Sequence, residues 1–180
     1  ELVIRDWSSD VCSSDLKISY NSIRPKGEKL KTFGGTASGH EPLQKMFEKF
    51  KMIIDGTLDD KIENNILEDG TVKLKPINML DILCSTGENV QVGGVRRTAI
   101  MISCDEDDYE IINCKKEFWL NTNLSHRAMS NNSIMFSNKP TIERLKEILE
   151  STKINGEPGF LNEQAGKKRR PNFRGVNPLI

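Results

Sequence analysis

The chain has 180 residues, and its 26 Lys and Arg balance its 26 Asp and Glu, so the formal net charge is zero. With 36% hydrophobic and 29% charged residues, the composition is typical of a globular protein, either one domain or part of a larger one. A neutral chain has no overall attraction to nucleic acid or to an anionic membrane, and no apolar run approaches the roughly 20 residues that span a bilayer.

The first 16 residues fit neither a signal peptide nor a folded element, because they lack a basic start and their Ser and Asp clusters break any periodicity. The stretch DWSSDVCSSDL also resembles one reading frame of a common sequencing adaptor. We therefore expect residues 1–16 to be a non-native segment, with a disordered tail as the alternative. The other end stops at Asn177-Pro178-Leu179-Ile180, directly after a predicted loop, so we expect a fragment of a longer protein.

The first half of the chain is predicted to hold a short strand, two helices and the loops between them. Residues 18–23 alternate like a strand, and Arg24-Pro25-Lys26-Gly27 is typical of a turn. A glycine-rich stretch, residues 32–39, precedes a helix that begins at Pro42 and ends at Asp55-Gly56. Residues 57–74 indicate a polar loop or a small hairpin.

The second half is predicted to alternate between helices and strands. Ile77, Leu80, Leu83 and Cys84 mark the inward face of a helix from Pro76 to about Glu88. The expected elements that follow are a strand at 98–103, an acidic turn at 105–108, a helix at 109–120, a strand at 133–136, a helix at 141–150 and an irregular tail at 155–178. This alternation predicts an α/β fold.

Two glycine-rich segments are candidates for binding phosphate. Gly34, Gly35, Thr36 and Ser38 lie just before a predicted helix, where backbone N–H groups can face an anion. The alternative is a tight turn that needs positive φ. In the segment Gly93-Gly94-Val95-Arg96-Arg97-Thr98, two glycines provide mobility and two guanidinium groups can grip phosphate oxygens, the alternative being a solvated basic turn.

The other reactive side chains do not suggest a site. The chain has four cysteines, Cys12, Cys84, Cys104 and Cys114, and none are in Cys-x-x-Cys spacing. This argues against a structural zinc site or a disulfide framework, so we expect a reducing, cytoplasmic compartment. Acidic neighbours of Cys104 and Cys114 are expected to raise the thiol pKa, so neither is predicted to be a nucleophile. No metal site is predicted, since His40 and His126 lack a ligand-spaced partner. The basic run at 167–170, with Arg174, indicates a solvated loop more than a nucleic-acid patch.

Several segments, read in order, resemble the adenosylcobalamin-dependent (class II) ribonucleoside-triphosphate reductases. They are Ser19–Gly27, Lys31–Gly39, Asp81–Cys84 with Gly93–Arg97, Met129–Ser133, Gly156–Asn162 and the closing Gly175–Pro178. The resemblance runs from about residue 17 to residue 180, and the order of the blocks makes it specific.

The resemblance implies part of a ten-stranded α/β barrel, its first half, with a central finger loop. In that family adenosylcobalamin generates a thiyl radical on a finger-loop cysteine, which abstracts the ribose 3′ hydrogen and leads to 2′-deoxyribonucleotides. The implied partners are a ribonucleoside triphosphate substrate, a dNTP effector and a thioredoxin-type reductant, without nucleic acid or membrane. The cofactor's own site is not expected within these residues.

The resemblance also assigns roles to the candidate residues. Gly93–Thr98 matches the loop that links the specificity effector to the substrate base, residues Gly34–Ser38 match the neighbourhood of the other specificity loop, and Arg24 matches a position that contacts effector phosphate. Asn177 matches an asparagine that hydrogen-bonds substrate.

The sequence departs from the family pattern at Leu179, which stands where the radical cysteine belongs. Because an aliphatic side chain has no S–H to oxidise, the chain as written is expected to be inactive. We favour a sequence error near the end of a fragment over a catalytically dead homologue. Two further alternatives are a fragment of a class I ribonucleoside-diphosphate reductase large subunit and a non-catalytic nucleotide-binding module.

Overall fold

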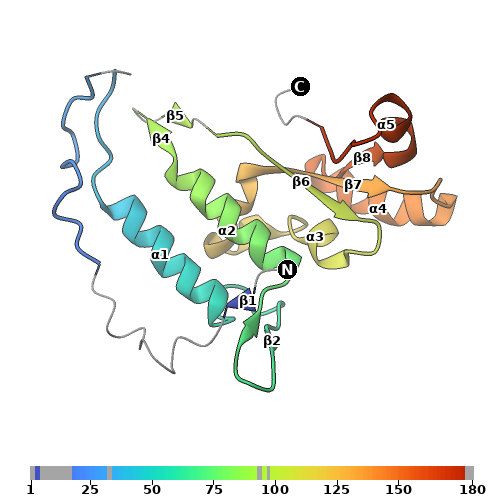
Figure 1. Ribbon diagram of the computed structural model, residues 1–180, viewed down its shortest axis with the longest axis horizontal. Helices are drawn as coiled ribbons and strands as arrows, with labels where there is room; N and C mark the ends of the chain where they lie inside the picture. The colour runs from blue at the N-terminus through green and yellow to red at the C-terminus, as the bar shows by residue number, and fades with distance from the viewer. Residues whose placement is uncertain (1–2, 5–17, 32–33, 93–94, 97, 177–180) are drawn as a thin grey trace. The chain divides into compact units, whose positions relative to one another are not determined.

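A computed structural model of the chain describes residues 3–4, 18–31, 34–92, 95–96 and 98–176 (Figure 1). The chain divides into two compact units, Glu1–Thr98 and Ala99–Ile180, which we call unit 1 and unit 2. Together they contain α-helices, antiparallel strands and a parallel sheet, so the mixed α/β class predicted from the sequence is confirmed.

Unit 1 is built on two helices that pack together, α1 (Glu41–Ile54) and α2 (Pro76–Asn89) (Figure 1). Each has a proline in its first turn, where the missing N–H costs no hydrogen bond, so the predicted starts are confirmed. Ile53, Ile77, Leu80 and Cys84 are buried between and beneath them. Leu83, which we expected to face inward, is 45% exposed. It lies about 100° around the helix from Cys84, outside the stripe that the neighbouring elements cover.

Short antiparallel strands complete unit 1. β2 (Asn65–Ile66) and β3 (Val72–Lys73) form the predicted hairpin, and β1 (Val3–Ile4) pairs with the other edge of β3. A strand at residues 3–4 differs from our expectation that residues 1–16 contain no folded element; the expectation that this segment is non-native stays a prediction. β4 (Gln91–Val92) and β5 (Val95–Arg96) pair directly after α2.

The predicted strand at residues 18–23 is wrong. The N–H of Ile23 donates to the carbonyl of Tyr20 at 3.0 Å, which closes a turn through Asn21 and Ser22. Asn and Ser favour turns because their short side chains bond to nearby backbone, and this local preference outweighs the alternating pattern. The Tyr20 ring stacks instead on His40, with 5.5 Å between ring centroids.

Unit 2 contains a three-stranded parallel sheet in the order β6-β7-β8, formed by β6 (Ile100–Asp105), β7 (Ser130–Phe136) and β8 (Gly159–Asn162) (Figure 1). The register pairs Ile100 with Ser130 and Ser133 with Gly159. Parallel neighbours require a crossover between strands. The first crossover holds α3 (Tyr109–Asn113) and two 3₁₀ segments, η2 (Phe118–Leu120) and η3 (Thr122–Met129), and the second holds α4 (Ile142–Asn155).

The core of unit 2 forms between the sheet and these crossovers. Ile134 is fully buried in the central strand, Ile148 of α4 is 1% exposed, and Ile111 and Ile112 of α3 are also buried. Thr141 caps α4 by accepting a hydrogen bond from the N–H of Arg144, and Gly156 ends the helix with a φ of 78°. Ending a helix in the left-handed region is a role that glycine fills at little cost.

Some predicted boundaries in unit 2 are wrong. The helix predicted for 109–120 ends at Asn113, because the chain then turns to bury Lys115 against β7. The tail that we expected to be irregular contains β8 and α5 (Glu163–Arg169). β8 is only four residues long, and its pattern of alternate exposure becomes meaningful only beside β7. Within the described residues, the helices are too short or too polar to cross a membrane.

Candidate functional site

The first group of predicted site residues lies on a tight hairpin-like loop of unit 1. The N–H of Gly27 donates to the carbonyl of Ala37 at 2.9 Å, and the N–H of Ala37 donates to the carbonyl of Glu28 at 2.8 Å. Gly34 and Gly35 have φ values of 69° and 82°, so the turn that we considered as an alternative is what the backbone adopts. The loop leads directly into α1.

The loop presents its polar groups to solvent. Gly34, Gly35, Thr36 and Ser38 are all exposed. Arg24 precedes the loop and lies 3.7 Å from the Glu28 carboxylate, with both side chains about half exposed at 54% and 52%. An exposed ion pair of this length contributes little to stability, so the guanidinium group remains available to a stronger anion.

The second group follows α2. β4 and β5 pair antiparallel, Gln91 with Arg96 and Val92 with Val95, so Val95 and Arg96 of the candidate segment lie on the second strand of this pair. Thr98 anchors the far end of the segment by donating a hydrogen bond from Oγ1 to the carbonyl of Gly87 at 3.2 Å. Gly93, Gly94 and Arg97 lie outside the described residues, as do the side chains of Val95 and Arg96.

The third group, Asn177 and Leu179, also lies outside the described residues. The chain that approaches it passes β6, because a Cβ built on Gly175 would lie 3.7 Å from the Ser103 hydroxyl oxygen. The structure therefore does not test whether Asn177 meets the arginines of the second group.

Two blocks that resemble the reductases do come together in unit 2. Residues 129–133 form the start of β7, residues 156–162 contain β8, and the two strands are adjacent and parallel. Ser130 and Asn132 are almost fully buried, at 2% and 3% exposed. These residues form part of the sheet's interior and do not line an open surface.

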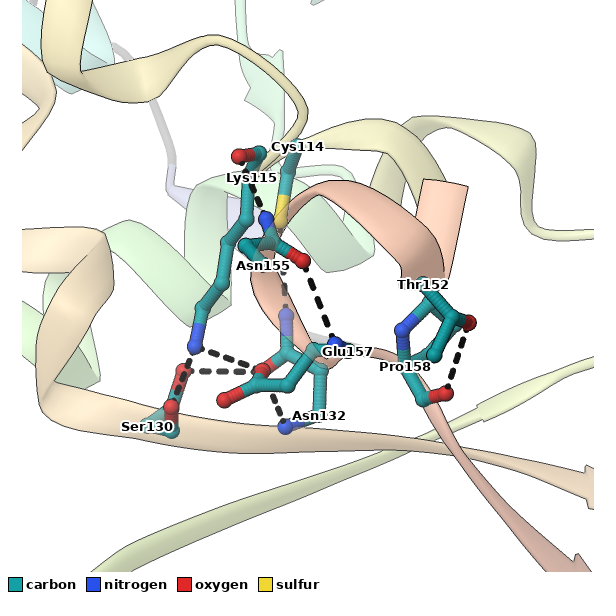
Figure 2. A network of polar contacts seen from close by, with 8 residues as sticks. All are labelled: Cys114, Lys115, Ser130, Asn132, Thr152, Asn155, Glu157 and Pro158. Atoms are coloured by element: carbon teal, nitrogen blue, oxygen red, sulfur yellow. Dashed lines mark hydrogen bonds and ion pairs between the residues drawn. The ribbon is translucent and has the colours of Figure 1, made fainter. Parts of the chain in front are cut away.

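A polar network holds these two blocks in place (Figure 2). The buried ammonium group of Lys115 donates to the carbonyl of Ser130 and lies 2.7 Å from Glu157 Oε2. The same carboxylate oxygen accepts the backbone N–H of Asn132 at 2.9 Å. One carboxylate thus joins the chain after α3, the start of β7 and the turn before β8.

Asn155 at the end of α4 extends the network. Its Nδ2 donates to the carbonyl of Lys115 at 2.7 Å, and its Oδ1 accepts the N–H of Glu157 at 3.1 Å (Figure 2). Ser130 Oγ donates to Asn132 Oδ1 at 2.8 Å, so the buried polar groups of β7 also have partners. A network satisfied in this way fixes one geometry, because any displacement leaves a buried polar group unpaired.

Sequence reasoning missed the network. Lys115 and Asn155 carried no signal, since a lysine and an asparagine near element ends are ordinarily solvated. Glu157 lies within the block at 156–162 but was not assigned a role. Only the packing of three segments that are distant in sequence buries these groups together.

Two of the described cysteines, Cys104 and Cys84, lie in the surroundings that we expected. Burial and the nearby Asp108 carboxylate raise the pKa of the Cys104 thiol to about 12, so the reactive thiolate is scarce at neutral pH. Cys84 is fully buried on α2, as predicted. His126 is buried, and its Nδ1 lies 3.0 Å from the carbonyl of Asn123. Within the part of the chain that the structure describes, His, Cys, Asp and Glu form no group of three that would hold a metal ion.

The carboxyl ends of β7 and β8 open into a groove of about 520 Å³ lined by Phe136, Ser137, Phe160 and Asn162, among others. Open α/β sheets commonly bind ligands at the carboxyl ends of their parallel strands. This groove could not be expected from the sequence, because β8, which forms one side of it, was not predicted.

Comparison with known proteins supports the resemblance seen in the sequence. Residues 8–54 match a family model described as the insertion domain of B12-dependent ribonucleotide reductase. This match begins within the segment that we expected to be non-native, and it describes an insertion domain, so the assignment of all of residues 17–180 to the barrel stays a prediction.

Among relatives, the chain is similar to adenosylcobalamin-dependent ribonucleoside-triphosphate reductases. It is 32% identical over 147 residues to the Lactobacillus acidophilus enzyme, covering 82% of this chain and 18% of that protein. It is 30% identical over 181 residues to the Euglena gracilis enzyme, covering 93% and 22%. For the Lactobacillus leichmannii enzyme the identity is 30% over 152 residues, covering 84% and 18%.

The chain thus spans about a fifth of the length of the curated relatives that it matches. No solved structure matches it. The relatives reported above share the adenosylcobalamin-dependent name, so the class I alternative is not favoured.

Proposed function

The chain is a relative of the adenosylcobalamin-dependent ribonucleoside-triphosphate reductases, and on that premise we propose that it forms part of the catalytic chain of such an enzyme. The whole enzyme would convert ribonucleoside triphosphates to 2′-deoxyribonucleotides by thiyl-radical chemistry in the cytoplasm. A dNTP effector would select the substrate, and a thioredoxin-type protein would supply the electrons.

The observation that carries this proposal is the continuous similarity over 82% to 93% of the chain to reductases of one type. The structure is consistent with it, since two of the resembling blocks lie on adjacent parallel strands in register, Ser133 opposite Gly159. Unrelated chance matches would have no reason to meet in a single buried network.

We further propose that β6, β7 and β8 are three strands of the ten-stranded barrel. Among the described strands, β6 and β8 each pair with β7 alone, so each has an edge to which a further strand can pair. Unpaired edges are avoided in complete sheets, and closure into a barrel removes them. The crossovers that connect these strands are helical, as an α/β barrel requires.

The exposed loops of unit 1 would contribute nucleotide recognition. Arg24 and the turn at Gly34–Ser38 offer a guanidinium group, backbone N–H groups and hydroxyls to an effector phosphate. The segment Gly93–Thr98 would link the bound effector to the substrate base, so that the effector's identity decides which base is accepted. The pairing of β4 with β5 and the hydrogen bond from Thr98 to the carbonyl of Gly87 support this role, because they hold the flanks of the segment in place.

As the resemblance implies, we expect other parts of the enzyme to hold adenosylcobalamin. The thiols of Cys84, Cys104 and Cys114 are buried in this chain. We assign these three buried thiols no redox role.

The test is turnover by the complete polypeptide that contains this chain, with adenosylcobalamin and a dithiol reductant present. We expect no dNTP formation with Leu179 and measurable formation with Leu179→Cys, because only a thiol can carry the radical. Leu179→Ser is the matched control, because it introduces a polar atom without an oxidisable sulfur and should remain inactive. Turnover with Leu179 retained, or none with the cysteine in a correctly folded protein, would contradict the proposal.

A further inference from the structure

A second groove of unit 2 has the chemistry of an anion site that the proposed function does not use. It has a volume of about 620 Å³ and lies between the end of β8, α5 and the segment that follows α5. Its polar lining includes three arginines and two asparagines, beside the ring of Phe173: Arg169, Arg170, Arg174, Asn162 and Asn172. We call it the arginine groove.

The backbone around the arginine groove is held by local contacts. The N–H of Arg170 donates to the carbonyl of Gly166, and the N–H of Phe173 donates to the carbonyl of Arg170, both at 2.9 Å. The Phe173 ring packs directly on Gly166, where an added Cβ would lie 2.4 Å from Cδ1 of the ring. The ring thereby folds the segment back onto α5 and brings Arg174 to the same groove as Arg169.

The charge of this region is strongly one-sided within a chain that is neutral overall. Of the fourteen residues 163–176, five are Lys or Arg and one is Glu. The carboxylate of Glu163 already forms an ion pair with Lys167, at 2.6 Å. Hydrogen bonds from Lys167 and Ser137, together with the nearby charge of Arg174, lower the pKa of Glu163. Among the described carboxylates, none lies within 4.0 Å of Arg169 or Arg170.

Three arginines line one concave surface, and an anion bound there would offset the repulsion between their positive charges. Guanidinium groups bind phosphate oxygens in pairs, and amide N–H₂ groups such as those of the two asparagines donate additional hydrogen bonds. We propose that the arginine groove binds the oligophosphate group of a nucleoside triphosphate.

A small ligand fits better than a nucleic acid. The three arginines of this region line one groove, and the neutral chain lacks the general attraction that non-specific nucleic-acid binding requires. The aromatic ring in the groove packs on Gly166, so that face is not available for stacking with a base.

The experiment is an isothermal titration of the 180-residue chain with inorganic tripolyphosphate and, separately, with ATP, at low salt. We expect each ligand to bind at the arginine groove, and this binding to become about tenfold weaker after Arg169→Gln, Arg170→Gln or Arg174→Gln, the loss typical of one charge-assisted hydrogen-bonding group. Lys146→Gln and Lys153→Gln on α4 are the matched controls, because they remove the same charge from exposed positions elsewhere in unit 2 and should change affinity less than twofold.

Arginine-to-lysine variants separate geometry from charge and retain the fold if the glutamine variants do not. We expect a loss of a few fold, since an ammonium group keeps the charge but not the two-pronged geometry. Equal losses in the α4 controls would overturn the proposal, as would tripolyphosphate binding without ATP binding. A single-stranded oligonucleotide that binds more tightly than ATP, and more tightly still when lengthened, would overturn it in favour of nucleic acid. Because the readout is binding alone, its outcome is independent of the reductase activity proposed above.

Discussion

The two units differ in where they place two of their family-like segments. In unit 1 the segment Gly34–Ser38 is an exposed turn, in which Gly34 and Gly35 take positive φ and the polar groups face solvent. In unit 2 the segment Met129–Ser133 lies almost entirely in the sheet, where Ser130 and Asn132 are buried and bonded within the network around Glu157. Segments that resemble the family equally well can therefore serve ligand contact in one region and structural support in another.

This difference predicts that the two units respond differently to substitution. Polar residues of unit 2 should control stability, whereas those of the unit 1 loops should affect it little and act through ligands. The four predictions below test that contrast, from the largest expected effect to the smallest.

The largest effect is expected from Glu157→Ala. It removes the carboxylate that pairs with buried Lys115 and that accepts the N–H of Asn132. Leaving a buried charge without its partner typically costs about 3–5 kcal/mol, and the 25% exposure of the Glu157 side chain places this case near the lower end. Urea denaturation should report a free energy of unfolding lower by about 3 kcal/mol.

Glu150→Ala is the control for this substitution, because Glu150 is exposed on α4 and its removal should change stability by less than about 0.5 kcal/mol. The corresponding change in unit 1 is Arg24→Ala, which breaks only an exposed ion pair and should be equally mild. If Glu157→Ala were as mild as these two, the network would not support unit 2.

An intermediate effect is expected when alanine replaces glycine at a positive φ. Gly34 in unit 1 and Gly156 in unit 2 have φ values of 69° and 78°, and an added Cβ would meet no atom within 4 Å at either site. Only backbone strain remains, so Gly34→Ala and Gly156→Ala should each cost about 1–2 kcal/mol. Hydrogen exchange should show the first loss in unit 1 and the second in unit 2.

Gly175→Ala is the control here, because its φ is not in the left-handed region and the new Cβ would make an ordinary contact with Ser103 at 3.7 Å. Its stability should change little. A loss that spreads equally over both units after either substitution would show that the two units unfold as one.

The smallest effect at neutral pH concerns the thiols. Cys84 in unit 1 and Cys104 in unit 2 are both buried, so thiol reagents should label neither in the native protein at pH 8 and both in urea. In single-cysteine variants, the urea concentration at which labelling begins should report the opening of each unit separately.

Cys104 also predicts a pH dependence. Its native pKa of about 12 lies above the ordinary value of 9.0, so between these pH values the unfolded state binds fewer protons than the native state. Stability should therefore be unaffected by this group below pH 9 and should fall as the pH rises from 9 toward 12. Cys104→Ala should reduce that fall, and an unchanged slope would contradict the assignment.

The sequence alone determined the elements with strong local signals. Helices α1 and α2 have a proline in the first turn and carry apolar stripes, Thr141 caps the start of α4, and the turn at Pro25–Gly27 follows from proline and glycine. The α/β class and the resemblance to the reductases also came from the sequence, the former from alternating patterns and the latter from ordered motifs. These features depend on residues that are near one another along the chain.

Tertiary structure decided what depends on distant partners. β8 becomes a strand because β7 provides its hydrogen bonds, and Lys115 is buried because Ser130 and Glu157 accept hydrogen bonds from its ammonium group. The arginine groove exists because the Phe173 ring folds the segment after α5 onto Gly166. Hydrogen bonding, burial and the approach of charged groups depend on distances in space, and a periodic pattern in a sequence reports only which face of an element is apolar.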